Sequence, residues 1–487
     1  MSKTFTKADI VNIAVDAMLV NGLDPDFSPQ AKQQLGSMHG PTEGYGSEIL
    51  DLTSLLWCSI DNDDSRDLDQ ITACEVLDDS STIIYVAIAD VDTLVKKGSP
   101  IDGHARTNTT SVYTSAKVFP MLPLRLSTDL TSLNPDQNRL AIVTIMKIGP
   151  DGELINSTVE RAWVRNKAQL AYDSVSAWID GKDELPAAAK AVPGMDEQLR
   201  RQDAVAQKLR LQRHAKGSLE FETFQPRAVF EGDRVVGITQ QEKNRARQLI
   251  EEFMIATNAC TADFLAEKGV ASIRRVVKSP ERWKRIVEVA KEYGYSLPGE
   301  PDGKALEKFL AVRHKADPLR FPDLSLTIIK LMGAGEYVVE FPGQKPIGHF
   351  GLAERDYTHS TAPNRRYPDL ITLRMTKAFL ANCPSPYGVD ELEELAVHCT
   401  RQEDAARKVE RRVRKSEAAL LLGTMIGQHF DAVVSGHSER GTWVRILTPP
   451  AEGRLVRTYG KVSVGKKIKV KLVLADVEQG FIDFERI

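Results

Sequence analysis

Apolar residues at helical spacing mark the start of the chain. In "TKADIVNIAVDAMLVNG" they recur on one face: Ile10, Ile13, Ala14, Ala17 and Met18. Thr6 followed by Asp9 gives a capping-box pattern, and Gly22 is a typical helix stop. The pattern predicts an amphipathic helix that ends before Gly22.

A second helix is predicted in "SPQAKQQLG", where Ser28 can act as the N-cap and Pro29 suits the first helical position. With extended chain around them, the two helices could form a winged-helix-like module over residues 1–55. The first 60 residues carry three basic and seven acidic side chains, a net charge of −4. Because a helix-turn-helix that binds duplex DNA is typically basic, we expect a packing or gating role and no duplex DNA partner.

The middle of the chain changes from strand patterns to helix patterns. "STIIYVAIADV" and "RLAIVTIMKIG" are continuous apolar runs rich in β-branched residues, as buried strands are. Helical stretches dominate from about residue 195 to 420, and "EDAARKVERRVRKSEAALLLGTMIG" reads as one long helix. Residues 56–425 are therefore expected to form a mixed α/β domain.

The last part of the chain predicts a small all-β barrel over residues 427–487. Its short strands are separated by glycine-marked turns: "DAVVSG", "GTWVRIL", "GRLVRTYG", "KKIKVKLVLAD" and "GFIDFERI". Residues 454–471 hold seven basic side chains, among them Lys461, and no acidic ones. Such a run can be a plain solvated face, but Trp443 and Tyr459 beside it favour stacking on single-stranded nucleic acid. The chain is thus an α+β multidomain protein.

Composition narrows the class further. Of 487 residues, 42% are hydrophobic and 27% charged, and the net charge of −3 advertises no general affinity for nucleic acid, so a nucleic-acid partner must meet local patches. The five cysteines form no CxxC pair, which disfavours a zinc site or a disulfide framework and fits a reducing cytoplasm. Asp9 and Asp16 interrupt the N-terminal apolar residues, so no secretory signal is expected. No apolar run is long enough for a membrane span. We expect a cytoplasmic monomer.

The stretch "SIDNDDSRDLDQ" carries the strongest chemical signal. It places five carboxylates within nine positions: Asp61, Asp63, Asp64, Asp67 and Asp69. In extended chain the alternation points Asp67 and Asp69 the same way, and Asp61 can return to them if the residues between turn. Converging carboxylates suit a hard divalent cation. The alternative is an acidic surface loop.

A calcium loop of the EF-hand type does not fit this stretch. The odd positions of that pattern are occupied by Asp61, Asp63, Ser65, Asp67 and Asp69. However, Arg66 stands where the loop needs glycine, and Thr72 stands where it needs glutamate.

Several motifs together resemble one known family. They are "SIDNDDSRDLDQ", "VAIADV", "SVYTSAKVFPMLPLRLSTDLTSLNP", "HFGL" at 349–352 and "TAPNRRYPDL" at 361–370. In order and spacing they resemble the catalytic (RNB) domain of the ribonuclease II / ribonuclease R family, over about residues 57–425. The last sixty residues are similar to the OB-fold RNA-binding domain repeated in ribosomal protein S-one.

The resemblance implies a metal site and one departure from it. Asp61, Asp67 and Asp69 match three of the four family aspartates that hold magnesium and the hydrolytic water. Gln70 stands where the fourth aspartate is expected, and an amide oxygen can ligate a metal without bringing charge. We expect Mg²⁺ as the cofactor, with Mn²⁺ as the alternative.

The resemblance also implies residues that hold the RNA. Arg365 matches the arginine that stabilises the scissile phosphate, and Arg366 matches a second basic position. Tyr113 and Phe221 match the two aromatics around the 3′ end, although for Phe221 plain core packing is an equal alternative. Tyr172 and Glu251 match positions near the ribose 2′-hydroxyl.

The function implied by the resemblance is processive 3′→5′ hydrolysis of single-stranded RNA to nucleoside 5′-monophosphates. The alternative is a non-catalytic RNA-binding protein on the same scaffold, which Gln70 motivates. The presence of Asp61, Asp67, Asp69 and Arg365 favours the enzyme.

Overall fold

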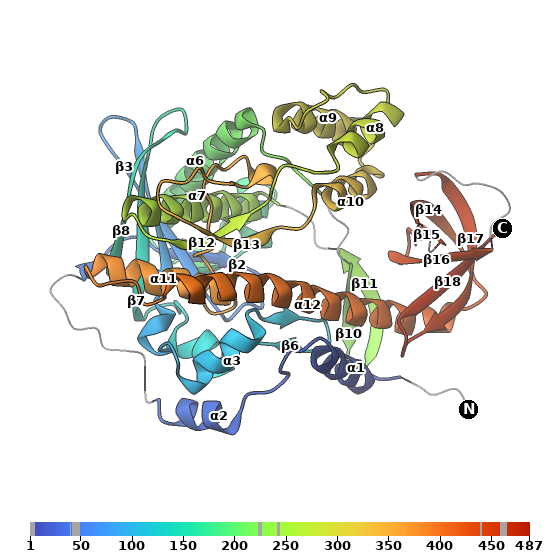
Figure 1. The fold of residues 1–487 in the computed structure, drawn as a ribbon, viewed down its shortest axis with the longest axis horizontal. Coiled ribbons are helices and arrows are strands. Elements are labelled where there is room, and N and C mark those ends of the chain that lie inside the picture. Colours follow the sequence, from blue (N-terminus) through green and yellow to red (C-terminus); the bar gives the residue numbers. More distant parts are fainter. Residues whose placement is uncertain are drawn as a thin grey trace.

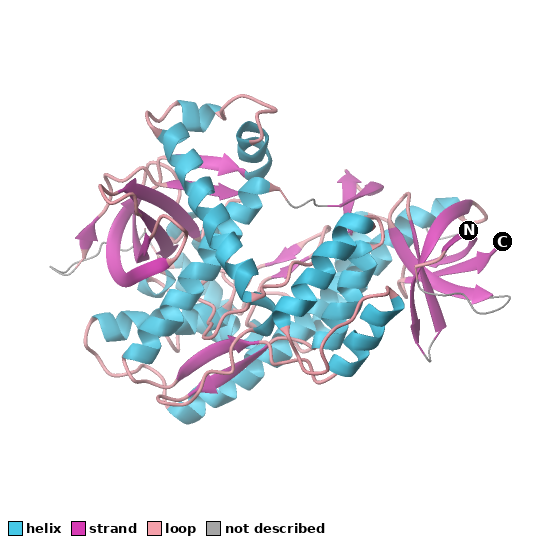
Figure 2. Ribbon diagram, turned by 90° about the horizontal axis from the view of Figure 1, so that it is seen from above, coloured by secondary structure: helices cyan, strands magenta, loops and turns pink. Residues whose placement is uncertain are grey.

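The computed structural model describes residues 5–38, 40, 49–222, 226–240, 244–438, 441–457 and 465–487. Figure 1 shows an α/β body, a long helix that leads out of it, and a barrel at the far end. Viewed from above, the two largest groups of strands lie at opposite ends of the molecule, with helices and a few short strands between them (Figure 2).

A mixed seven-stranded sheet forms the centre of the body, in the order β1-β8-β7-β4-β3-β2-β9. Only the two outermost pairs are parallel, β1 with β8 and β2 with β9. The strands are β1 (Leu50–Asp51), β2 (Cys58–Asp61), β3 (Gln70–Val76), β4 (Thr82–Ala89), β7 (Asn138–Ile148), β8 (Leu154–Arg165) and β9 (Ala168–Ala171). β4 and β7 are the two apolar runs predicted as buried strands, and the structure confirms both.

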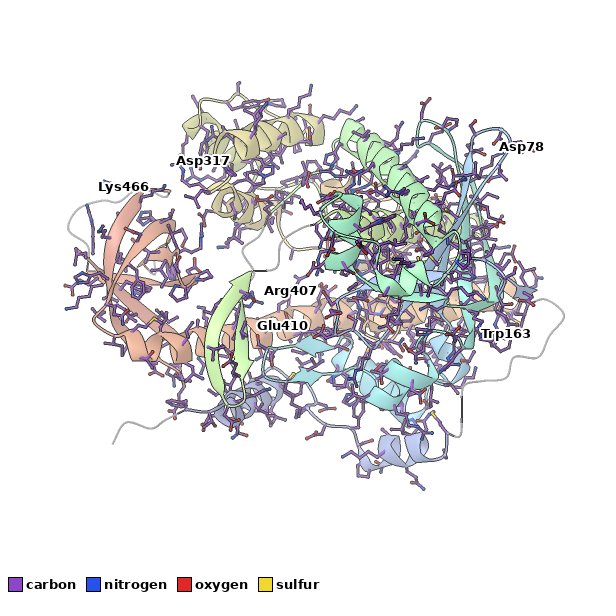
Figure 3. All side chains as sticks on the ribbon, turned by 180° about the vertical axis from the view of Figure 1, so that it is seen from behind. Asp78, Trp163, Asp317, Arg407, Glu410 and Lys466 are labelled. Atoms are coloured by element: carbon purple, nitrogen blue, oxygen red, sulfur yellow. The ribbon has the colours of Figure 1, made fainter. Side chains whose placement is uncertain are left out.

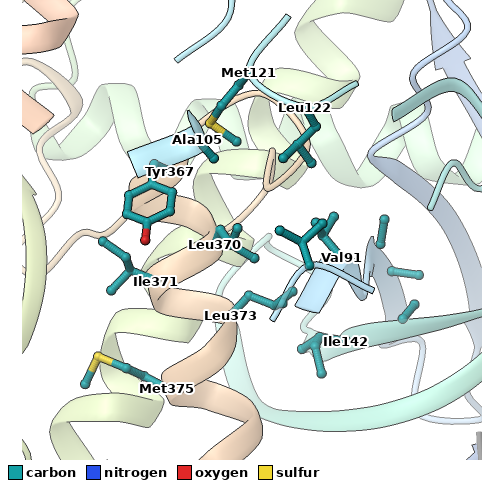
Figure 4. Close-up of a cluster of buried hydrophobic side chains, with 14 of the residues drawn as sticks. Val91, Ala105, Met121, Leu122, Ile142, Tyr367, Leu370, Ile371, Leu373 and Met375 are labelled. Atoms are coloured by element: carbon teal, nitrogen blue, oxygen red, sulfur yellow. The ribbon is translucent and has the colours of Figure 1, made fainter. Parts of the chain in front are cut away.

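Helices cover both faces of the sheet, because the central strands are apolar on both sides. One core joins alternate strand residues such as Ile71 and Ala87 to α11 (Tyr367–Leu380), and Figure 4 shows its cluster around Leu370 and Leu373. α3 (Pro100–Asn108) belongs to the same layer. The opposite core joins the other strand residues to α4 (Tyr172–Ile179), α5 (Ala187–Lys190), α6 (Met195–Lys216) and α7 (Arg245–Glu267).

Smaller units complete the body. α8 (Trp283–Glu292), α9 (Gly303–Ala316) and α10 (Phe321–Met332) pack around their own core. Three two-stranded sheets are formed by β5 (Val112–Tyr113) with β6 (Val118–Phe119), β10 (Pro226–Glu231) with β11 (Arg234–Gln240), and β12 (Ser272–Val276) with β13 (Glu336–Glu340).

The longest helix, α12 (Val389–Leu422), spans 34 residues and connects the body to the barrel. It includes most of the stretch predicted as one long helix. Its buried residues Val409 and Val413 share one hydrophobic cluster with α1 (Lys7–Val20), the β5–β6 hairpin and the barrel. The barrel therefore sits on a helix that is itself part of the body.

The barrel closes in the order β14-β15-β16-β18-β17, which confirms the predicted all-β fold. Its strands are β14 (His429–Ser438), β15 (Gly441–Ile446), β16 (Ala451–Arg457), β17 (Lys467–Asp476) and β18 (Phe481–Arg486). A second tie joins it to the three-helix unit: Arg445 on β15 donates to both oxygens of Asp323 on α10, at 3.2 and 2.8 Å. Both side chains of this pair are buried. Figure 3 shows Lys466 of the barrel on the side of Asp317, next to α10.

The N-terminal helices are present as expected, and their grouping as a winged-helix-like module over residues 1–55 stays a prediction. Thr6 and Asp9 form the expected capping box of α1, and Ser28 caps α2 (Pro29–Gly36). However, the apolar face of α1 packs against α12, whereas α2 packs against α3 in the core of the body. Each helix therefore buries its apolar face against a different neighbour.

All five cysteines are free thiols. In the part of the chain that the structure describes, no helix is both long and apolar enough to cross a membrane.

The Arg445–Asp323 pair predicts where the barrel is most sensitive. Asp323→Ala should lower the local stability of β15 by about 3 kcal/mol, because it removes the carboxylate that faces a buried guanidinium. Hydrogen exchange of the β15 and α10 amides would measure this. Glu197→Gln on α6 removes one partner of an exposed pair with Arg201 and should change stability by less than about 1 kcal/mol. Equal effects of the two variants would contradict a supporting role for the buried pair.

Candidate active site

The acidic stretch lies at one edge of the central sheet. β2 ends at Asp61 and the adjacent β3 starts at Gln70, so residues 62–69 form the connection between two neighbouring strands. β9 runs parallel to β2 with Ala171 beside Asp61, and Tyr172 follows at the start of α4. Both helical layers meet the sheet at this edge.

Asp69 is the buried centre of the site, with 1% of its surface exposed. Its Oδ1 accepts a hydrogen bond from the backbone N–H of Asn364 at 3.0 Å. Arg365 places its Nε 3.4 Å from Oδ2. Burial raises the pKa of Asp69 to about 7, although the Arg365 charge and the Asn364 hydrogen bond oppose this shift.

The other carboxylates are coupled to this centre. Burial raises the pKa of Asp67; Arg365 lowers it, and the nearby charges of Asp61 and Asp64 raise it. Asp61 accepts hydrogen bonds through Oδ1 from the Asn62 N–H at 2.7 Å and from the Ser65 hydroxyl at 3.0 Å. The like charges of this loop therefore lie close enough to repel each other.

The donor set fits a hard cation. Asp69 Oδ2 is buried and has no hydrogen-bond partner among the described residues, so only the Arg365 charge offsets it. A divalent cation would neutralise Asp69 together with the coupled Asp67 and Asp61. The described residues nevertheless contain no group of three such side chains already gathered to hold a metal. Asp61 Oδ1 and Asp69 Oδ1 are instead engaged by their own hydrogen bonds.

Gln70 faces the other side of the sheet edge from Asp69. It pairs with Ile88 on β4, which belongs to the core beneath α4 and α7, whereas Ile71 belongs to the α11 core. Successive strand residues alternate between faces, so Gln70 lies on the α4–α7 side and Asp69 on the α11 side. Gln70 is 8% exposed, and its role as a metal ligand stays a prediction.

Tyr113 and Arg365 are fixed next to each other. The Ser111 N–H donates to the Arg365 carbonyl at 3.0 Å, and Thr110 bridges to Arg366 in the same small ladder. Tyr113 is 39% exposed. Burial raises the pKa of its hydroxyl to about 12, with Arg365 and Asp67 among the charges that act on it. A half-exposed ring thus stands beside the phosphate-binding candidate.

Tyr172 stands on the opposite side of the site together with a residue that the sequence motifs did not single out. The Arg247 guanidinium lies 4.3 Å from the centre of the Tyr172 ring, and its Nη2 donates to Asn62 Oδ1 at 2.9 Å. Burial and the charge of Asp61 raise the pKa of Tyr172. Glu251 is exposed one helical turn after Arg247 on α7, so both project from the same face. That spacing was the only sequence signal for Arg247.

The remaining predicted residues lie in several places. Arg366 donates to the Asp369 carboxylate at 2.7 Å, which gives it a structural role at the start of α11. Phe221 is partly buried against the core of the three-helix unit, the packing that the sequence left open. Trp443 is partly exposed on β15 and pairs with Arg454 on the neighbouring strand β16. Tyr459 and Lys461 lie outside the described residues.

Comparison with known families supports the interpretation of the motifs. The RNB domain family matches residues 49–382, and the RNase II-type exonuclease C-terminal S1 domain family matches residues 428–487. Ribonuclease R 1 of Lactococcus lactis subsp. lactis is 28% identical over 480 residues, covering 91% of this chain and 57% of that protein. Ribonuclease R of Escherichia coli is 31% identical over 451 residues, covering 89% and 54%. The chain thus spans only about half the length of these curated relatives.

Solved structures share the fold. RNase R of Mycoplasma genitalium in complex with ribose methylated single-stranded RNA superposes with a TM-score of 0.89 at 23% identity, over 98% of this chain and 78% of that one. Yeast Ssd1, described as a pseudonuclease, superposes with a TM-score of 0.71 at 14% identity, over 95% and 57%. One fold is therefore shared by a protein crystallised with RNA and by a pseudonuclease.

The buried Asp69 predicts a pH-dependent gain in stability when its charge is removed. With a pKa near 7 in the folded state and near 4 when unfolded, Asp69 destabilises the fold increasingly as the pH rises through this interval. In EDTA at about pH 8, Asp69→Asn should raise the free energy of unfolding by roughly 2 kcal/mol, and the gain should vanish near pH 4. Urea titration at both pH values measures this, with exposed Asp78→Asn as the control. The same gain at both pH values would contradict the buried charge.

Proposed function

This chain belongs to the RNB family, and we propose that it hydrolyses single-stranded RNA processively from the 3′ end to nucleoside 5′-monophosphates. The observation that carries the proposal is the pairing of buried Asp69 with Arg365, which is itself 45% exposed at the sheet edge. A carboxylate that has one oxygen without a hydrogen bond lies beside a guanidinium open to a ligand. Phosphodiester hydrolysis needs both parts of this arrangement. A carboxylate is needed to position the attacking water, and a positive charge is needed to stabilise the phosphate.

Each side chain then has a separate task. Arg365 receives a non-bridging phosphate oxygen and offsets the charge that builds there. Tyr113 stacks on a base near the 3′ end. Tyr172 and Glu251, on the other side of the site, recognise the ribose 2′-hydroxyl. Asp61, Asp67 and Asp69 would hold Mg²⁺, with Gln70 at the fourth position and Mn²⁺ as the alternative ion. When bound, the metal supplies an activated water and relieves charge on the leaving oxygen.

The barrel supplies affinity for the chain of phosphates. Arg454, Lys467, Lys469 and Lys471 are on its described strands, and Trp443 offers a surface for stacking. Such contacts release counterions and bind single strands without regard to sequence. The RNA-bound structures of the Mycoplasma relative, with single-stranded and with double-stranded RNA, support RNA as the partner class. A monomeric state and a cytoplasmic location stay predictions; the free thiols agree with a reducing compartment.

A non-catalytic RNA-binding protein is the second candidate. Gln70 favours it, because it removes one charge from the expected metal shell, and so does the similarity in fold to a pseudonuclease. Asp61, Asp67, Asp69 and Arg365 are all present and, in the case of Asp69 and Arg365, in contact. This favours the enzyme.

Hydrolysis of a 5′-labelled RNA decides between the two candidates. With Mg²⁺ the label should pass from full-length RNA directly to a short end product, as processive shortening requires, while unlabelled mononucleotides accumulate, and EDTA should stop both. Asp69→Asn should reduce the rate by a factor on the order of 10² or more while RNA affinity stays near that of the wild type. Exposed Asp78→Asn is the control, with the same change of charge. An intact protein that binds RNA but releases no mononucleotide would be the RNA-binding alternative.

Because Gln70 carries no charge, we expect this protein to need a high Mg²⁺ concentration for half-maximal rate. Gln70→Asp adds one negative charge to the site, so the Mg²⁺ concentration for half-maximal rate should fall on the order of ten-fold. Gln344→Asp makes the same chemical change at an exposed loop residue and should leave the titration where it was. If Gln70→Asp leaves the Mg²⁺ titration unmoved, residue 70 lies outside the metal shell.

A further inference from the structure

The hairpin that carries Tyr113 is too short to hold its own shape. β5 and β6 contribute two residues each, paired as Val112 with Phe119 and Tyr113 with Val118. Inside the turn, the Thr114 hydroxyl donates to the Lys117 carbonyl at 2.6 Å and accepts from the Lys117 N–H at 3.0 Å. Isolated hairpins of any length are marginal in water, so the position of the Tyr113 ring must be set from outside.

Two glutamates of α12 provide that outside support. Glu410 Oε1 accepts a hydrogen bond from the Tyr113 N–H at 3.1 Å. Glu417 faces the turn of the hairpin, where the polar groups of Ser115 and Ala116 lower its pKa against the larger rise that burial causes. Residues seven apart share one face of a helix, so both glutamates face the hairpin. Glu410 contacts its strand β5, and Glu417 contacts its turn. Figure 3 shows Glu410 on α12 beside the body.

The apolar side of the hairpin packs on α12 between the contacts made by Glu410 and Glu417. Val112 and Phe119 belong to the same buried cluster as Val409 and Val413 of α12. The hydrophobic contact holds the hairpin on the helix, and the carboxylates fix its register along the helix. Apolar contact alone would not do so, because it has no direction.

Burying the Glu417 carboxyl group is energetically unfavourable, so packing alone does not explain this residue. It is 2% exposed, one of its oxygens has no hydrogen-bond partner among the described residues, and burial raises its pKa to about 7. A leucine at this position would extend the apolar face of α12 without such a penalty. The carboxyl group is therefore explained by the N–H groups of the turn, which need an acceptor.

The same two turns of α12 also receive the barrel. Arg412 donates to the backbone carbonyls of Glu478 and Gln479, in the turn between β17 and β18. A Cβ on Gly480 would lie 3.0 Å from that of Lys415, so this turn sits directly on the helix. Segment 409–417 is thus a common seat for the barrel and for the Tyr113 hairpin.

We propose that Glu410 and Glu417 are positioning residues that hold the Tyr113 ring where the base near the RNA 3′ end stacks, on a helix that also seats the barrel. The proposal rests on the function proposed above, because it assumes that Tyr113 meets RNA. Neither glutamate is among the residues proposed to bind the phosphate or the metal. Their effect on RNA binding is therefore expected to pass through Tyr113.

A double-mutant cycle on RNA binding tests this without requiring hydrolysis. The probe is a short single-stranded RNA with 2-aminopurine next to its 3′ end, added to the full chain in EDTA, where stacking on Tyr113 quenches the fluorescence. Glu417→Leu should weaken the binding of this RNA on the order of ten-fold and reduce the quenching, which is the scale of one lost base–aromatic stack. Tyr113→Ala should do the same. Combined, the two changes should be no worse than Tyr113→Ala alone.

Conservative variants separate positioning from folding. Glu417→Gln keeps an acceptor for the turn and should restore affinity and quenching to near the wild-type values, and Glu410→Ala, at a partly exposed residue, should mimic Glu417→Leu in a milder form. Glu394→Gln, at an exposed site on α12, is the control. The proposal is overturned if Glu417→Leu weakens binding equally with and without Tyr113, or if Glu410→Ala leaves the quenching unchanged. If wild type and Tyr113→Ala both fail to bind the RNA at all, the proposed function has failed instead.

Discussion

The contact of Asp69 with Asn364 and Arg365 is the interaction on which the arrangement of the site depends. It joins the residue before β3 to the segment before α11, which is 295 positions away in the sequence. Because the Asn364 N–H and the Arg365 guanidinium both converge on one buried carboxylate, the edge of the sheet and the start of the covering helix are fixed relative to each other. The same segment is tied through its backbone to Ser111, and so to the Tyr113 hairpin. One buried charge thus sets the positions of the acid, the cation and the aromatic ring.

The sequence predicted the elements well where a local pattern determined them. The apolar runs of β4 and β7, the capping box of α1 and all five barrel strands follow from periodicity and turn residues. The motif around Asp61–Gln70 indicated the chemistry, but its partners come from distant segments and have no local signature. Arg247, which lies over Tyr172, and Glu417, which holds the Tyr113 hairpin, are ordinary charged residues on helices until the fold brings them there. The two N-terminal helices follow from their caps and periodicity, but the neighbours that cover them do not, since an amphipathic face does not reveal which neighbour will cover it.

α12 connects the barrel to the body of the molecule and limits how the barrel can move. A barrel attached by a loop would sample many positions, but here the β17–β18 turn rests on Arg412 and the Arg445–Asp323 pair ties β15 to α10. The barrel therefore has two attachments, one to α12 and one to α10, which together restrict its movement relative to the body. Under the proposed function, an RNA held by the basic barrel strands would reach Tyr113 along α12, which contacts both the barrel and the Tyr113 hairpin.

Gln70 stands where the family pattern has an aspartate, and repulsion among the neighbouring carboxylates explains why an uncharged residue suits this position. Asp61, Asp64 and Asp69 already act on Asp67 or on one another, and burial leaves Asp69 with a pKa near neutrality. A further aspartate at residue 70 would sit on the opposite face of the same strand start, buried to a similar degree, and would add another charge that only a cation could offset. Glutamine keeps a polar oxygen at that position without the repulsion, so the metal-free fold is less strained. For the proposed metal role of Gln70, the consequence would be a weaker attraction for the cation, because an amide dipole cannot replace a full negative charge at the same distance. Under that proposal, stability without metal and affinity for metal would oppose each other at this one position.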